Sequence, residues 1–174
     1  MKTPTAAEIM IPLEEYPHIP YWFTIRQALV ELENAALTTS GGRRSLPRVV
    51  LVFNESYQLL GMARRRDLLR ALQLDTVSGR GAGHRRLFRR DAAAPQEVNE
   101  EILGRLREHA ERPVSDAMTP ITATVSADDP LLKVARELVE HDVALLPVLR
   151  EGSVAGVVRT VEVLHHVTGL LGEA

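Results

Sequence analysis

Hydrophobic residues follow two periodicities in the second half of the chain, and these predict a helix followed by two strands. The helix opens at Asp129–Pro130, a pair that suits the cap and the first turn. Its predicted inward face consists of Leu131, Leu132, Ala135, Leu138 and Val139. Two apolar runs, 144–149 and 154–158, predict strands joined by a tight turn at Glu151–Gly152. A second helix is predicted from Thr160, with inward residues Val161, Leu164 and Val167.

The first half of the chain predicts the same order of elements. Its first helix has an apolar face formed by Ile25, Ala28, Leu29, Leu32 and Ala36. The continuous apolar run at 49–53 predicts a strand that is buried on both faces. A second strand is predicted at 59–63 and a second helix at 67–72. The glycine-containing stretch 38–44 is extra relative to the second half, and we expect a mobile loop there.

Blocks of sequence recur in the same order in the two halves, which indicates an internal repeat. Residues 7–13, AEIMIPL, recur as residues 115–121, SDAMTPI, at a distance of 108 positions. Residues 61–69, GMARRRDLL, align with residues 156–164, GVVRTVEVL. Because both blocks keep their place among the predicted elements, chance similarity is a poor explanation.

The alignment divides the chain into a first repeat at 6–72, a connecting segment at 73–113 and a second repeat at 114–168. It matches Ile25 of the first predicted helix with Leu132 of the second. Each repeat is close to the lower size limit for an independent hydrophobic core. We therefore expect the repeats to pack on each other as a pseudo-two-fold pair, with clefts where they meet.

These repeats resemble the CBS domain, the cystathionine-β-synthase type, which occurs in tandem pairs called Bateman modules. The resemblance rests on the order of elements and on the segments AEIMIP, SDAMTP, GMARRRDLL and LLPVLREGSVAGVV. It implies an α/β fold of two helix–strand–strand–helix repeats and a homodimer formed through helical faces. It also implies a regulatory module that binds AMP, ADP, ATP or another adenosyl ligand and signals to an unidentified effector protein in trans.

The family pattern at the last strand and helix is glycine, two hydrophobic residues, threonine or serine, and an aspartate three positions later. In the family the aspartate binds ribose and the hydroxyl residue contacts phosphate. Here arginine replaces the hydroxyl residue in both repeats, as Arg64 and Arg159, and the acids are Asp67 and Glu162. The arginines can bind phosphate, or fold back onto the neighbouring carboxylate and block the cleft.

We expect different roles for the two acidic residues, Asp67 and Glu162. Asp67 can bind ribose or simply cap its helix, and both alternatives stay open. Glu162 is one methylene longer, and we expect a solvated acid in the first turn. If only one cleft binds a ligand, we expect it to be the cleft beside Asp67.

The resemblance also implies which residues surround each ligand. The Asp67 cleft would contain Arg64 and Met62 and, from the second repeat, Thr122, Ala123, Val143 and Ala144. The opposite cleft would contain Arg159, Glu162 and residues 16–19. Tyr16 and residues 21–23 can stack on a base, although aromatic residues beside a helix start more often belong to the core.

Composition and charge exclude several classes of function. The absence of cysteine excludes disulfides, thiolate metal sites and a cysteine nucleophile. A formal net charge of -2 gives no general attraction to nucleic acid or to anionic lipid. No apolar run approaches the length of a membrane span, so we expect a cytoplasmic protein. We find no catalytic or metal-binding constellation in the sequence and therefore expect no enzymatic activity.

The connecting segment has two parts of opposite charge. Residues 80–90 contain five arginines and no acid, whereas residues 97–111 are acidic. The second part predicts a packing helix with Val98, Ile102, Leu106 and Ala110 on one face. Nucleic-acid contact through the arginines is a weak alternative, because stacking aromatic residues are nearly absent from the segment. The main alternative to nucleotide sensing is a ligand-free dimeric interaction module with degenerate pockets.

Overall fold

The computed structural model describes residues 3–38, 42, 44–73 and 100–172. The first half contains α1 (Ala6–Ile9), β1 (Ile11–Pro12), η1 (Leu13–Glu15), β2 (His18–Pro20), α2 (Ile25–Asn34), β3 (Leu37–Thr38), β4 (Arg44–Ser45), β5 (Val49–Phe53), β6 (Leu59–Arg64) and α3 (Arg65–Ala71). The second half contains α5 (Glu100–Ala110), η2 (Val114–Asp116), β7 (Thr119–Pro120), β8 (Val125–Ser126), α6 (Leu131–Glu140), β9 (Leu145–Arg150), β10 (Ser153–Arg159) and α7 (Thr160–Gly172). The predicted α/β fold is confirmed, and the arginine-rich stretch 80–90 lies outside the described residues.

Each of the two four-stranded sheets contains a short strand that belongs to the other repeat. The strand orders are β1-β10-β9-β8 and β2-β5-β6-β7. In the first sheet, β1 pairs antiparallel with β10, with Ile11 opposite Val157. In the second sheet, β7 pairs antiparallel with β6, with Thr119 opposite Met62. The predicted packing of one repeat on the other is therefore confirmed, and it takes the form of exchanged edge strands.

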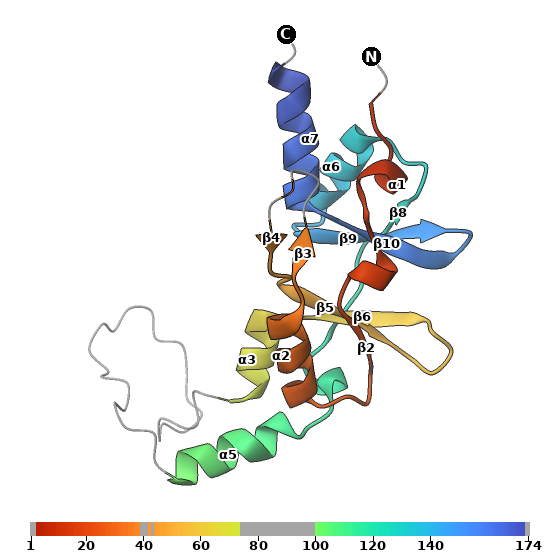
Figure 1. Ribbon diagram of the computed structural model, residues 1–174. Helices are drawn as coiled ribbons and strands as arrows, with labels where there is room; N and C mark the ends of the chain where they lie inside the picture. The colour runs from red at the N-terminus through yellow and green to blue at the C-terminus, as the bar shows by residue number, and fades with distance from the viewer. Residues whose placement is uncertain (1–2, 39–41, 43, 74–99, 173–174) are drawn as a thin grey trace.

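The layers follow from this exchange. Figure 1 shows the two sheets one above the other, with α6 and α7 beyond one sheet and α2 and α3 beyond the other. The connecting helix α5 lies near α2, and Glu111, the residue after α5, forms an ion pair of 2.6 Å through its Oε1 with Nε of Arg26 in α2. Within α5, Ile102 and Leu106 are half-buried and Ala110 is buried, as predicted, whereas Val98 lies outside the described residues.

Three hydrophobic clusters fill the spaces between these layers. The cluster between the second-repeat helices and their sheet includes Leu131, Val134, Leu138, Leu146, Val148, Val158 and Val163. The cluster between the sheets includes Ile11, Leu13, Tyr16, Leu51, Met62, Leu145 and Val157. The cluster under the first-repeat helices includes Ile25, Ala28, Leu32, Val50, Val52 and Leu68. Strand β5 contributes alternate residues to two clusters, which confirms the predicted burial of 49–53 on both faces.

The predicted inward face of α6 is partly wrong. The buried residues of this helix are Leu131, Val134 and Leu138. Leu132 and Val139, predicted to face inward, are 62% and 80% exposed. Pro130 is the N-cap, so the first helical residue is Leu131, and it is Leu131 rather than Leu132 that occupies the place of Ile25. A one-residue shift of the alignment turns a helix by about 100° and exposes the wrong residues.

Two other sequence predictions also need correction. In α7, Val161 and Leu164 are 52% and 63% exposed, and the buried residues are Glu162 and Val163. The helix turns its acidic residue inward because that carboxylate has a buried partner, described below. In the first repeat, Ala36, predicted on the helix face, lies beyond the end of α2. Strands β3 and β4 pair at the two ends of the expected loop 38–44, whose residues 39–41 and 43 lie outside the described residues.

Two glycines make the strand exchange possible. A Cβ atom at Gly61 would lie 2.5 Å from the carbonyl oxygen of Thr119 in β7. A Cβ atom at Gly156 would clash in the same way with the carbonyl oxygen of Ile11 in β1. Because backbone cannot move aside as a flexible side chain can, only glycine allows this approach. The same contact at both positions reproduces the internal repeat in three dimensions.

We expect Gly61→Ala and Gly156→Ala each to lower the free energy of unfolding by about 1–3 kcal/mol, because the added methyl group pushes the exchanged strand off its sheet. Gly169→Ala is the matched control, since Gly169 lies in α7 with nothing within 4 Å of its Cβ position. It should raise stability by up to about 1 kcal/mol through helix propensity. Urea unfolding followed by circular dichroism measures all three, and unchanged stability in Gly156→Ala would contradict the account.

Candidate functional site

The first candidate cleft is marked by Asp67 at the start of α3. Strand β6 ends at Arg64 and the helix follows directly, so Asp67 lies in its first turn. Its carboxylate accepts hydrogen bonds from Arg64 Nε at 2.7 Å, from Arg64 Nη2 at 3.2 Å and from the Arg64 backbone N–H at 3.2 Å. Arg70 Nη1 adds a contact of 3.4 Å. Asp67 thus caps its helix and is also paired with arginine.

The electrostatic balance at Asp67 favours the ionised form. Burial of the carboxylate by itself opposes ionisation. The hydrogen bonds from the side chain and backbone of Arg64, together with the charges of Arg64 and Arg70, outweigh burial and hold the pKa of Asp67 below its usual value. The Asp67 side chain is 4% exposed, whereas that of Arg64 is 54% exposed. The acid is therefore fixed and its partner arginine lies at the surface.

The second candidate cleft repeats this arrangement in a buried form. Glu162 accepts hydrogen bonds from Arg159 Nε at 2.9 Å, from Arg159 Nη2 at 2.5 Å and from the Arg159 backbone N–H at 3.2 Å. The two side chains are only 1% and 9% exposed. The expectation that Glu162 is a solvated first-turn acid is therefore wrong. Its longer side chain is turned inward because it caps the helix and neutralises a buried guanidinium.

Two further residues, Tyr16 and Ser45, interact with the buried Arg159–Glu162 pair. Tyr16 is buried, and its hydroxyl has no hydrogen-bond partner among the described residues. Burial raises the pKa of that hydroxyl far above its usual range, while the charge of Arg159 opposes the rise and that of Glu162 adds to it. From the other side, Ser45 of β4 accepts a contact of 3.4 Å from Arg159 Nη1.

Sequence reasoning missed Ser45, which directly follows the extra stretch 38–44 of the first repeat. The residue is 114 positions away from Arg159 and belongs to no motif. The only signal was the presence of the extra stretch itself. Of the two alternatives for Tyr16, base stacking or a place in the core, the structure shows the favoured one, a place in the core between the sheets. Tyr21 and Phe23 pack against the core beneath the first-repeat helices, whereas Trp22 is half exposed.

The remaining predicted ligand-binding residues are only partly brought together. Met62 is buried in β6, and its carbonyl accepts a hydrogen bond of 3.3 Å from the Thr119 hydroxyl. Thr122, three residues after Thr119, is exposed. Ala123 and Val143 pack partly against the core on the helical side of the other sheet.

Ala144 lies between α6 and β9. Its carbonyl accepts a hydrogen bond of 3.0 Å from the backbone N–H of Thr160, so its backbone is fixed at the start of α7.

Several arginines lie close to Asp67 in the sequence. Besides Arg64 and Arg70, the exposed Arg66 and half-buried Arg65 lie on the same short helix.

Within the described ranges, no three histidine, aspartate or glutamate side chains are arranged to hold a metal ion. None of the described helices is long and apolar enough to cross a membrane.

Comparisons with known proteins agree with this architecture. A family model described as CBS domain matches residues 114–169. The crystal structure of the CBS-pair protein CBSX2 from Arabidopsis thaliana is similar with a TM-score of 0.64 and 19% identity, and the match covers 99% of this chain and 100% of that chain. A comparison with curated protein sequences found no match.

Two similar structures contain nucleotides. CBSX2 in complex with AMP has a TM-score of 0.61 and 19% identity, over 96% of this chain and 98% of that chain. The cytosolic domain of the Mg²⁺ channel MgtE in complex with ATP has a TM-score of 0.58 and 22% identity, over 92% of this chain and 48% of that chain. Residues 114–169 match the CBS domain family model, and the chain as a whole has the fold of the CBS-pair proteins.

Proposed function

We propose that this chain is a regulatory module that binds one adenine nucleotide, or a related adenosyl ligand, in the cleft beside Asp67 and signals to a partner protein in trans. The fold and the AMP and ATP complexes of similar structures support the ligand class. The observation that carries the choice of cleft is the exposure of the arginine. Arg64 is 54% exposed and can leave its carboxylate for solvent or ligand, whereas Arg159 is 9% exposed.

Binding at Asp67 is an exchange of partners. A ligand phosphate takes the place of the carboxylate beside Arg64, and the freed Asp67 carboxylate accepts hydrogen bonds from the ribose hydroxyls. Both charges stay paired in the bound state, so the exchange avoids the cost of an isolated buried charge. Arg70 and Arg66 on the same helix add positive potential for the phosphates. The ligand can transmit a signal only if it binds two arrangements of the repeats with different affinity.

We expect AMP, ADP or ATP at about 100 times the dissociation constant to stabilise the chain by about 2.7 kcal/mol, a rise in Tm of roughly 5–10 °C. Asp67→Ala should abolish the rise for nucleotides and for adenosine, because the ribose contact is lost. Arg64→Ala should weaken the nucleotides about tenfold and leave adenosine unaffected or tighter, because it removes the phosphate partner and frees the acid. Isothermal titration calorimetry measures these affinities and the stoichiometry.

Arg150→Ala is the matched control, because it removes one exposed arginine from the end of β9, outside the proposed site, and should leave nucleotide affinity within about twofold. The second candidate function is the ligand-free interaction module, and the pairing of both carboxylates with arginine favours it. If no adenosyl ligand at millimolar concentration gives a heat of binding or a change in Tm, nucleotide binding is rejected in favour of this second function.

The cleft beside Glu162 contributes stability instead of ligand binding in this proposal. Both carboxylate oxygens of Glu162 accept hydrogen bonds from Arg159. Loss of either residue would leave the charge of the other buried without compensation. The stoichiometry is therefore one ligand per chain, although the fold contains two pseudo-equivalent positions.

Glu162→Gln should lower the free energy of unfolding by about 3–5 kcal/mol, because the Arg159 guanidinium then stays buried without a counter-charge. Asp67→Asn is the equivalent change in the first repeat and should cost about 1 kcal/mol, since Arg64 can turn to water. Chemical unfolding at neutral pH compares the two variants. Equal losses in both would show that the two clefts do not differ in the way proposed.

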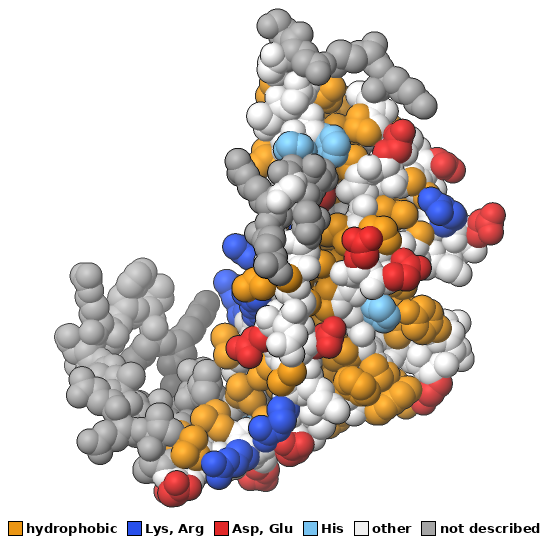
Figure 2. All heavy atoms as spheres, viewed as in Figure 1, with side chains coloured by type: hydrophobic (Ala, Val, Ile, Leu, Met, Phe, Trp, Pro, Cys, Tyr) orange, Lys and Arg blue, Asp and Glu red, His pale blue; other side chains and the backbone are white. Residues whose placement is uncertain are grey.

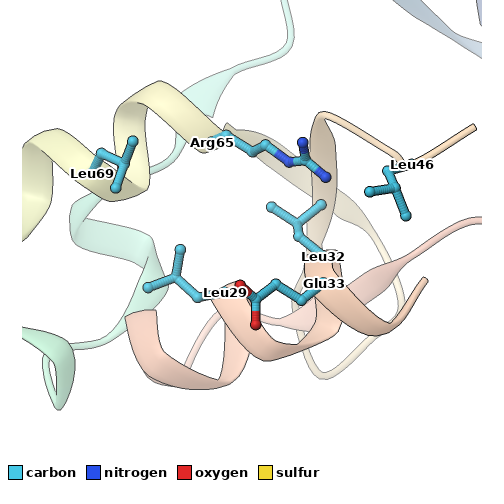
Figure 3. A pocket seen from close by; sticks show the side chains of 6 residues that line it. All are labelled: Leu29, Leu32, Glu33, Leu46, Arg65 and Leu69. Atoms are coloured by element: carbon cyan, nitrogen blue, oxygen red, sulfur yellow. The ribbon is translucent and has the colours of Figure 1, made fainter. Parts of the chain in front are cut away.

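We also propose that two copies associate through their helical faces. Leu69 in α3 and Leu164 in α7 occupy the same position of the two repeats and are 48% and 63% exposed. Figure 3 shows the groove between α2 and α3, whose volume is about 480 Å³ and whose lining includes Leu29, Leu32, Leu46 and Leu69 together with Glu33 and Arg65. Exposed aliphatic residues on both helix pairs are typical of an interface with a second copy.

Sedimentation should show a dimer, and Leu69→Glu and Leu164→Glu should each weaken it about tenfold or more, because a carboxylate would have to be desolvated in the interface. Leu60→Glu in β6 is the control, since Leu60 is 37% exposed but lies away from the helices. A monomer at micromolar concentration for the unaltered chain, or a dimer that survives both helix variants, would contradict the proposal.

A further inference from the structure

Aromatic side chains are concentrated at one corner of the first repeat. Six of the seven phenylalanine, tyrosine and tryptophan residues of the chain lie between positions 16 and 57. We call the aromatic ridge the group formed by His18, Tyr21, Trp22, Phe53 and Tyr57. It runs from β2 and the turn after it to the turn between β5 and β6. Within it, Trp22 is 50% exposed and Tyr57 is 61% exposed.

The exposed ring of Tyr57 is held in a fixed position. It stacks on Phe53 with 4.9 Å between the ring centroids, and its hydroxyl lies 2.8 Å from Nε2 of His18. His18 Nδ1 lies 2.8 Å from the carbonyl oxygen of Tyr16, which can only accept, so Nδ1 donates this hydrogen bond and fixes the orientation of the ring. A rigid exposed aromatic ring loses little entropy on binding a partner.

The backbone of Tyr57 adds an independent sign of function. Its φ is 57°, in the left-handed region where glycine or asparagine is the usual residue and a bulky side chain is strained. Such strain is retained where a particular side chain is needed at a site. The equivalent turn of the second repeat has Glu151 and Gly152 at positive φ and contains no aromatic residue. The fold itself therefore does not require tyrosine at this turn.

The surroundings of the aromatic ridge are acidic. The Tyr21 hydroxyl donates a hydrogen bond of 2.9 Å to Glu55 in the β5–β6 turn. Beside His18 lies a cavity of about 240 Å³ lined by Glu14, Glu15, Tyr16, Pro17, His18, Glu31, Ala35 and Ala36. This lining contains three carboxylates and neither lysine nor arginine. Figure 2 shows acidic and hydrophobic side chains next to each other on this face of the molecule.

We propose that the aromatic ridge and the acidic cavity beside it form a docking surface for an arginine- or lysine-bearing segment of a partner protein. Tryptophan and tyrosine faces attract guanidinium and ammonium groups. Carboxylates next to them accept the charge-assisted hydrogen bonds of the same groups. Tryptophan and tyrosine are also the residues that most often dominate the binding energy of protein interfaces. The surface does not include Asp67, so its test is separate from that of nucleotide binding.

The position of Trp22, the only tryptophan of the chain, allows a direct test on the full-length protein. A nonapeptide of alternating arginine and glycine should change the Trp22 fluorescence in a saturable way, and an equivalent peptide with glutamate should not. Tyr57→Ala should weaken binding of the arginine peptide about tenfold or more. The double variant Glu14→Gln with Glu15→Gln should weaken it to a similar extent without touching the aromatic rings.

Glu151→Gln is the matched control, because it removes one carboxylate from the equivalent turn of the second repeat and should change affinity less than about twofold. Tyr57→Phe keeps the ring and should lose much less affinity than Tyr57→Ala. If Tyr57→Ala does not fold cooperatively, the glutamine double variant decides alone. Unsaturable fluorescence changes, equal weakening by Glu151→Gln, or a ridge variant that alters self-association but not peptide binding would overturn the proposal.

Discussion

The close approach of exchanged edge strands to two glycines is the constraint on which the remaining structure depends. Strand β1 completes the sheet of the second repeat and β7 completes that of the first. Gly61 and Gly156 provide the space for these crossings. Because each sheet contains chain from both repeats, the cluster between the sheets has no equivalent in a single repeat. The exchange therefore also fixes how the two repeats sit relative to each other.

The two repeats have the same architecture, but their arginine–carboxylate pairs differ in burial. Both pairs use the same positions, and both carboxylates also cap the following helix. What differs is the environment of the arginine, since Arg64 lies at the surface while Arg159 is buried and donates a hydrogen bond to Ser45 of β4. A surface pair contributes little to stability and can be exchanged for a ligand, whereas a buried pair is costly to break. In the function proposed above, one motif thus serves binding in one repeat and stability in the other.

Much of the fold was predictable because local pattern determines it. The bounds of β5, the turn at Glu151–Gly152 and the start of α7 agree with the sequence predictions. The inward face of α6 was not predicted correctly. A proline can be either the N-cap or a first-turn residue, and the choice between them shifts the helix by one position. The burial of Glu162 was not predictable either. Its environment is assembled from Arg159, Tyr16 and Ser45, and no motif connects these three positions.

Native-state hydrogen exchange of the β6 and β10 amides tests the exchanged-strand account most directly. If each sheet needs chain from both repeats, the most protected amides of the two strands should open with the same free energy, equal to that of global unfolding. Destabilisation of either repeat should then lower both values together. Protection of β10 that persists while β6 exchanges at a much lower free energy would show two independent units and contradict the account.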